Sequence, residues 1–448
     1  MSDELFSRVL AAGPVRALVN DEAWLQAMLD VEGALASSQA EVGLLDTEEA
    51  DRIAEACSAS YYDVAEIAEQ SRGVGNPAAP LVRALTERVG GAAGRHVHRG
   101  ATSQDVVDSA AMLIADRALG ALLSELDECA GSVAALAEDH LDTVQVGRTL
   151  EQHATPVTFG FTAAGWLSGL DASARRLTEV RDRLAVQLGG ATGTLASLGQ
   201  DGTKVLAAIA RRLGLSEPTL PWHTERSRVA ELAGALGETC GVVRKIAGDI
   251  VLLGQTEIAE LSEEGPPGSG GSSTMPHKRN PVAAIAAIAS ARQAPGLVTT
   301  LLDAMAHEHQ RAAGAWHAEW RPFNELLRST GSAVSWLRTS VRRLRVNPDR
   351  MRENLEHTGG LLLAERVTTE LAPILGRLEA HDAVSACCQR VASGEGELGD
   401  LLAADPVVGG QLSRARIGEL LDPAGYLGSA TTFTERALAA YRRAKGVS

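Results

Sequence analysis

Apolar residues recur at helical spacing through long stretches of this chain that contain no proline. Three such stretches cover residues 81–155, 157–217 and 222–265, and a proline would interrupt any helix that ran through it. Within the second stretch, one set of residues falls on a single helix face: Leu167, Leu170, Ala174, Leu177, Leu184 and Leu188. The spacing predicts a helix of about 30 residues, roughly 45 Å long. A helix of that length needs partners along its apolar face.

The same pattern predicts an all-α fold with a central bundle of long helices. No segment of the sequence alternates apolar and polar residues for long enough to indicate a half-buried sheet, and aromatic residues make up only 3 % of the chain. We divide the chain into an N-terminal helical domain over residues 1–110, a central long-helix bundle over 111–355, and a C-terminal helical domain over 356–448. The last begins near Gly359 and Gly360.

Composition narrows the classes of partner. The chain has 448 residues and a net charge of -15, which argues against general nucleic-acid binding and against attachment to an anionic membrane. An anionic substrate would therefore need a local cationic pocket. The first residues lack a basic region followed by an apolar core, and no uninterrupted apolar run reaches about 18 residues. Five cysteines without metal-ligand spacing fit a reducing compartment. We expect a cytoplasmic protein.

The most distinctive segment is rich in glycine and proline and runs from residue 265 to 281. Its second half reads GGSSTMPHKRNP. The glycines permit unusual backbone angles and the prolines prevent a continuous helix, so we interpret it as a mobile loop. Backbone N–H groups and an ammonium suit a carboxylate ligand. The alternative is a surface linker, but ordinary linkers do not carry the ordered string Ser-Ser-x-Met-Pro-x-Lys-x-Asn-Pro.

A second cluster, residues 98–105, reads HRGATSQD and precedes a helical pattern. Thr102 and Ser103 lie just before the predicted helix, where hydroxyls and free N–H groups can bind an anion. A simple helix cap is the alternative, and it is favoured when this cluster is considered alone.

A third cluster, residues 147–158, reads GRTLEQHATPVT. A lone histidine such as His153 is by default more often a hydrogen-bonded structural residue than a catalyst.

A further string, residues 306–320, reads AHEHQRAAGAWHAEW and carries several histidines. Their spacing is poor evidence for a metal site. A tryptophan pair packed in the core, with Arg311 and Arg321 at a pocket edge, is the better interpretation. We predict neither a metal nor another cofactor.

Taken together, these motifs resemble those of the fumarase/aspartase superfamily, whose members share a helical fold and catalyse reversible elimination beside a carboxylate. The resemblance implies that Ser272 is the catalytic base and that Lys278 and Asn280 hold the substrate carboxylate. It also implies a catalytic or orienting role for His153. Further substrate-binding candidates are His98, Thr102, Ser103, Thr158, Arg311 and Arg321.

One departure points to a branch of that superfamily. Many members carry histidine directly after the threonine of the third cluster, where this chain has Leu150. A histidine only at His153 resembles the 3-carboxy-cis,cis-muconate cycloisomerase branch, as do residues 21–32 and 306–320. That resemblance implies conversion of a small tricarboxylate, 3-carboxy-cis,cis-muconate, to carboxymuconolactone in protocatechuate (beta-ketoadipate) catabolism. It also implies a homotetramer with shared active sites.

Two alternatives remain open at this point. Adenylosuccinate lyase, or another carbon–nitrogen lyase, shares the loop signature, although its amine leaving group requires a general acid. A non-catalytic, crystallin-like structural protein is the other alternative. The intact candidate residues argue against it.

Overall fold

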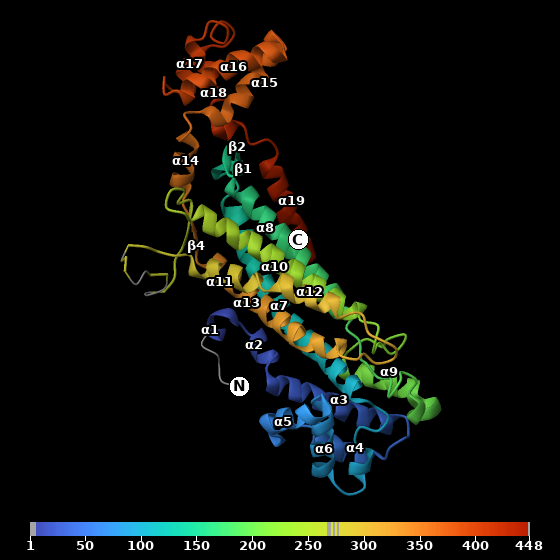
Figure 1. Cartoon of the computed structure of the whole chain (residues 1–448). Helices are drawn as coiled ribbons and strands as arrows, with labels where there is room; N and C mark the ends of the chain where they lie inside the picture. Colours follow the sequence, from blue (N-terminus) through green and yellow to red (C-terminus); the bar gives the residue numbers. More distant parts are fainter. Residues whose placement is uncertain (1–5, 267–269, 272–273, 276, 447–448) are drawn as a thin grey trace. The chain divides into compact units, whose positions relative to one another are not determined.

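The computed structural model describes residues 6–266, 270–271, 274–275 and 277–446, and most of them are helical. The four longest helices are α7 (Ser103–Asp139), α8 (Phe159–Asp182), α10 (Ser227–Leu253) and α13 (Ala315–Arg342). The predicted helical fold with long helices is confirmed (Figure 1). The chain forms two compact units. Unit 1 contains residues 6–128, 172–245 and 285–338, and unit 2 contains residues 129–171, 246–284 and 339–446.

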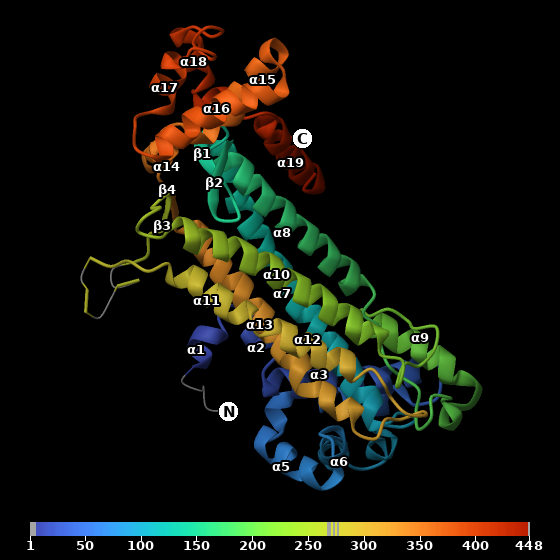
Figure 2. The same ribbon diagram turned by 45° about the horizontal axis from the view of Figure 1, so that its top comes forward.

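Within unit 1 the long helices pack side by side, as Figure 2 lets the reader follow. Polar contacts join neighbouring helices of the bundle: Asp116 with Arg181 at 2.8 Å, Arg176 with Glu238 at 2.7 Å, Cys240 with Thr330 at 3.3 Å, and Glu128 with Arg338 at 2.7 Å. Apolar side chains fill the space between the helices, among them Leu119, Leu122, Leu177, Leu236 and Leu326. Burial of these apolar faces stabilises helices that would be marginal alone.

Helix α8 is shorter than the sequence predicted. It ends at Asp182, so Leu184 and Leu188 lie beyond it although both are 1 % exposed. Here the chain turns into an extended segment, in which Ala185 forms a bridge with Ser216. Apolar spacing alone cannot separate a continuing helix from a buried extended segment, because both bury the same residues.

Shorter helices complete unit 1. They are α1 (Ser7–Leu10), α2 (Val15–Leu18), α3 (Asp21–Glu41), α4 (Thr47–Glu55), α5 (Val64–Val74), α6 (Ala78–Val89), α9 (Gly202–Leu213) and α12 (Ala294–Asp303). Side chains of Asn20, Asp46 and Asp63 cap α3, α4 and α5 by accepting from free backbone N–H groups. Helix α11 (Val282–Ala291) precedes α12. The stretch Val282–Asp303 is long and apolar enough to cross a membrane by length and composition, but it includes buried core residues such as Ala284 and Ala287.

Unit 2 contains the strands. Strand β1 (Val144–Thr149) pairs antiparallel with β2 (Gln152–Thr158), and β3 (Leu261–Glu263) pairs with β4 (Leu344–Val346). Helix α14 (Pro348–Glu356) follows β4, and α19 (Ala430–Ala444) ends the described chain.

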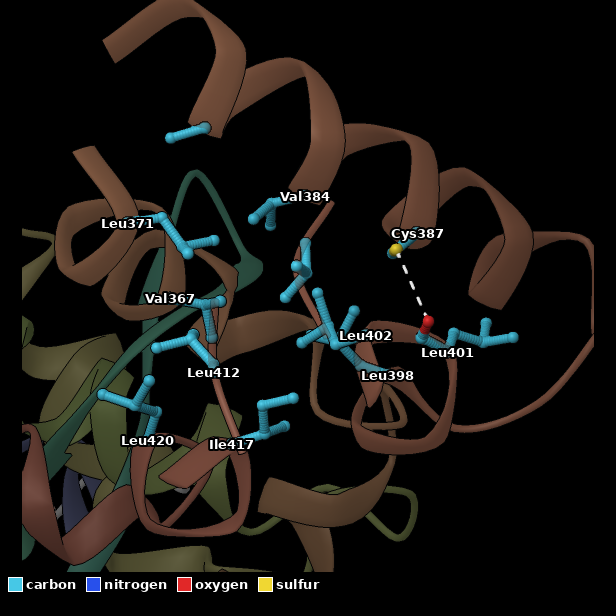
Figure 3. Packing of buried hydrophobic residues seen from close by; sticks show 12 residues of the cluster. Val367, Leu371, Val384, Cys387, Leu398, Leu401, Leu402, Leu412, Ile417 and Leu420 are labelled. Atoms are coloured by element: carbon cyan, nitrogen blue, oxygen red, sulfur yellow. Dashed lines mark hydrogen bonds between the residues drawn. The ribbon is translucent and has the colours of Figure 1, made fainter. Parts of the chain in front are cut away.

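The C-terminal part of unit 2 has its own apolar core. Helices α15 (Ala364–Leu375), α16 (Arg377–Ala392), α17 (Leu398–Ala404) and α18 (Arg414–Leu420) surround it. Leu371, Val384 and Leu402 point into this core (Figure 3). The proposed division of the whole chain at residues 110 and 355 stays a prediction.

Candidate active site

A buried carboxylate holds the turn that leads into α7. Asp105 is 1 % exposed. Its partners are Thr102 N at 3.0 Å, Gly190 N at 2.8 Å, Gly189 N at 3.0 Å, Gln187 Nε2 at 2.9 Å and His223 Nε2 at 2.7 Å. The bond from Thr102 N back to Asp105 is a capping-box contact, which satisfies a free N–H at the start of the helix. Asp105 therefore orients the turn.

The hydroxyl of Thr102 meets a cation from a distant part of the sequence. Arg311 Nη1 donates to Thr102 Oγ1 at 2.9 Å. Both residues are half-buried, as is Ser103, the first residue of α7. A guanidinium, hydroxyls and the N-terminus of a 37-residue helix together form a favourable setting for a carboxylate. Arg321 is exposed on α13.

His98 forms an ion pair in the same turn. Its Nδ1 lies 2.6 Å from Oε1 of Glu32, which is 1 % exposed, and its φ of 61° is in the left-handed region. Burial alone would lower the pKa of His98. The charge and hydrogen bond of Glu32 outweigh that effect, so the pKa lies above its usual value. The pair favours the imidazolium form of His98.

A buried ion cluster supports the segment that carries Arg311. Arg226 donates to Asp108 at 2.8 Å and to Glu319 at 3.0 Å, and all three side chains are at most 4 % exposed. His307 lies 3.2 Å from Glu319, and Trp316 Nε1 donates to Asp108 at 3.0 Å.

The rings of Trp316 and Trp320 lie 4.8 Å apart in a T-shaped arrangement. The prediction of a packed tryptophan pair is therefore confirmed, and His307 belongs to the same buried cluster.

The third sequence cluster forms the β1–β2 hairpin. Leu150 and Glu151 make its tip, with φ angles of 51° and 64°, a conformation that costs energy for side chains of this size. Leu150 is 97 % exposed. A bulge at Gly147 breaks the register, and a Cβ there would lie 2.3 Å from the carbonyl oxygen of Thr155. The hairpin thus presents an apolar side chain at the position where, in the sequence motif, many members of the fumarase/aspartase superfamily carry a histidine.

His153 lies on β2 directly opposite Arg148 on β1. Arg148 in turn binds the fully buried Glu260, with Nη2 at 2.6 Å from Oε1. Glu260 also accepts from Gln145 at 2.8 Å and from Asn354 at 2.7 Å. These bonds fix the hairpin to the residue that directly precedes β3, the strand that leads into the glycine-rich loop.

Thr158 is the last residue of β2 and directly precedes α8. It is fully buried, and its Oγ1 accepts from Phe161 N at 3.1 Å. Its hydroxyl therefore caps α8. The substrate contact expected for Thr158 stays a prediction.

The two ends of the glycine-rich loop are anchored. Glu263 accepts from Ala283 N at 3.0 Å, from Ala284 N at 2.8 Å, and from the Ser340 hydroxyl. Its carboxylate thereby caps α11.

Asn280 donates from both N and Nδ2 to the carbonyl oxygen of Gly270, at 2.8 and 3.2 Å. A Cβ on Gly270 would lie 2.7 Å from Asn280 O. Lys278 is exposed. Ser272 and Ser273 lie outside the described residues.

Known proteins resemble the chain over almost its whole length. A family model described as "Lyase" matches residues 8–296, and one described as "Adenylosuccinate lyase C-terminus" matches residues 360–437. The chain belongs to the fumarase/aspartase superfamily. It is 46 % identical to a 3-carboxy-cis,cis-muconate cycloisomerase of Pseudomonas aeruginosa, covering 98 % of this chain and 96 % of that protein.

Two further superfamily members bear on substrate choice. A nitrosuccinate lyase of Streptomyces davaonensis is 40 % identical to this chain, and the similarity covers 98 % of this chain and 95 % of that protein. The crystal structure of the 3-carboxy-cis,cis-muconate lactonizing enzyme from Pseudomonas putida superposes with a TM-score of 0.93 at 42 % identity, covering 98 % of this chain and 99 % of that one.

The structure groups the superfamily motifs only in part. It brings Thr102 and Arg311 into contact in unit 1, where His98 belongs to the same turn. In unit 2, no hydrogen bond or ion pair among the described residues joins His153 to Lys278 or Asn280.

Sequence reasoning missed several supporting residues. Glu260 and Glu263 have no local signal, because an acidic residue in a short polar segment is usually a solvated surface group. The ion cluster around Arg226 was missed for a different reason, since its carboxylates stand about a hundred residues away on either side.

Proposed function

We propose that the protein is a 3-carboxy-cis,cis-muconate cycloisomerase. The likeness to the enzyme of that name from Pseudomonas aeruginosa, at 46 % identity over nearly the full length of both chains, carries the proposal. The exposed Leu150 at the hairpin tip agrees with it. An apolar side chain cannot protonate a leaving group, and in the lactone-opening direction the leaving carboxylate needs little protonation.

The reaction is an addition that conserves all atoms and electrons. One substrate carboxylate oxygen forms a C–O bond to a carbon of the conjugated system, and the π electrons move to the neighbouring carbon beside another carboxylate. That carbon then takes up a proton. The attack is intramolecular, so the enzyme mainly positions the substrate, stabilises charge and delivers the proton.

The candidate residues divide these tasks. Ser272 exchanges the carbon-bound proton, while Lys278 and Asn280 hold the carboxylate on which negative charge accumulates. Thr102, Ser103 and Arg311 form a second carboxylate-binding group, supported by the contact at 2.9 Å and by the start of α7. His98, Thr158 and Arg321 complete the proposed substrate-binding set. No cofactor is needed for this chemistry.

A second candidate is nitrosuccinate elimination, which the 40 % identical Streptomyces davaonensis protein favours. Nitrite, like a carboxylate, is a weak base that leaves without strong protonation, so Leu150 suits both reactions. Adenylosuccinate is a poorer candidate, because its amine leaving group calls for a general acid.

A three-substrate assay separates these candidates. We expect the purified protein to remove the conjugated-diene absorbance of 3-carboxy-cis,cis-muconate, at an unchanged rate in excess chelator. Adenylosuccinate should not be cleaved. Rapid nitrite release from nitrosuccinate, with no action on the muconate, would replace the cycloisomerase proposal by the second candidate.

We further propose a cytoplasmic homotetramer whose active sites are each built from three subunits. Within unit 1, Ile285 on α11 and Leu302 on α12 are large apolar side chains that are 47 and 49 % exposed, and contact with a partner would bury them. Other copies of the chain are the occupants we propose. The five cysteines are all free, as is typical of a reducing compartment.

Mixing two inactive variants tests the shared sites. We expect Ser272→Ala and His153→Ala proteins to be nearly inactive alone and to regain activity when co-assembled. If the two residues come from different subunits, random mixing leaves both intact in about a quarter of the sites. Recovery is measured as turnover after verified subunit exchange. A monomer in sedimentation, or exchanged tetramers that stay inactive, would rule this arrangement out.

A further inference from the structure

His153 has one ring nitrogen enclosed by protein. Its Nδ1 is buried and has no hydrogen-bond partner among the described residues. The ring centroid lies 6.1 Å from that of His357, which directly follows α14, more than two hundred residues further along the chain. A second imidazole therefore stands beside the only histidine of the hairpin.

The charges around His153 come from three elements. Arg148 faces it across the β1–β2 ladder, His357 approaches from the end of α14, and Glu260 lies just before β3. The carboxylate of Glu260 is already engaged by Arg148 at 2.6 Å and by the amides of Gln145 and Asn354. Because these partners already compensate most of its negative charge, Glu260 does little to stabilise a protonated His153.

Most of these surroundings disfavour the protonated form of His153. Burial is the largest influence that lowers its pKa, followed by the positive charge of Arg148 and by His357, while Glu260 acts in the opposite sense. The enclosed Nδ1 adds an independent argument. An imidazolium would place an unpaired N–H donor in a buried position, which is costly. The neutral ring with its proton on Nε2 leaves only an acceptor unpaired.

We propose that His153 acts as a neutral imidazole that donates a hydrogen bond from Nε2 to a substrate carboxylate, and that His357 is a positioning residue that keeps it neutral. Two imidazoles whose centroids lie 6.1 Å apart disfavour simultaneous protonation, because their positive charges repel. His153 then orients the substrate, and no proton passes through it during lactonisation. This inference rests on the proposed function, because it assumes that His153 faces the substrate.

Titration of His153 by nuclear magnetic resonance tests the assignment without requiring turnover. The full-length protein is labelled in its histidine rings, and the His153 signal is identified by its loss in His153→Gln. We expect a titration midpoint below that of an ordinary histidine and nitrogen shifts typical of the Nε2–H tautomer. His357→Gln should move the midpoint upward. His381→Gln, which removes an exposed histidine on α16, should leave it in place.

The pH profile of kcat/KM supplies the functional measurement. If activity requires a neutral His153, the His357→Gln variant should match the wild type near pH 8. Near pH 6 its kcat/KM should be severalfold lower than that of the wild type, because the raised titration midpoint leaves less of His153 neutral. A charged His153 at neutral pH, or a midpoint that His357→Gln does not move, would overturn the inference whatever the substrate. The expected titrations without muconate turnover would support the protonation state and reject the proposed function.

Discussion

Arg226→Met should destabilise the protein by about 3–5 kcal/mol, because it leaves two buried carboxylates without their shared cation. Asp108 and Glu319 are each at most 4 % exposed and bind the same guanidinium. Burial opposes a charge on Arg226, but the two carboxylates outweigh it and raise its pKa above the usual value. The measurement is the urea unfolding curve at fixed protein concentration, compared with the wild type.

A matched control removes an exposed ion pair from the same bundle. Arg183 pairs with Glu231 at 2.5 Å, and both side chains are more than 40 % exposed. Arg183→Met should therefore change the unfolding curve far less. Adding Asp108→Asn and Glu319→Gln to Arg226→Met should restore part of the loss, because it removes the uncompensated charges. Equal effects of the Arg226 and Arg183 variants would contradict this account of the cluster.

The helical fold could be predicted because its signal is local. Proline-free stretches and apolar residues at helical spacing correctly indicate long helices, and the bundle follows from their need for partners. The end of α8 could not be placed in this way. Leu184 and Leu188 are buried in an extended segment whose partner, Ser216, lies about thirty residues away. Pairing of that kind leaves no periodic trace in the sequence.

The β1–β2 hairpin could not be predicted from the sequence either. Its two strands are short, and its tip lacks the Asn-Gly or Asp-Gly pair that usually marks such a turn. Leu150 and Glu151 occupy left-handed backbone conformations instead. The motif therefore marks this segment as a candidate site, but the sequence does not predict that it forms a hairpin.

The candidate residues that belong to sequence motifs could be named from the sequence. The residues that contact and position them could not. The motifs located Thr102 and His153. They could not reveal that Arg311 donates to Thr102 across 209 residues, or that His357 stands beside His153. Such pairs depend on how distant helices and strands come together. A resemblance transfers the motif residues, whereas their supporting partners have to be read from the fold.

Ser272→Ala is expected to lower kcat/KM by roughly 10²- to 10⁴-fold, the usual contribution of a positioned acid or base. The loss follows from removing the only group proposed to exchange the carbon-bound proton. The unfolding curve should stay close to that of the wild type, because the change deletes one hydroxyl from a segment whose sequence predicts a loop. Ser273→Ala is the matched control and should be much milder. Turnover of the muconate and urea unfolding are measured on both variants. Small and equal losses at the two serines would remove Ser272 from the proposed role, and a loss of folding in Ser272→Ala would show that this serine is structural.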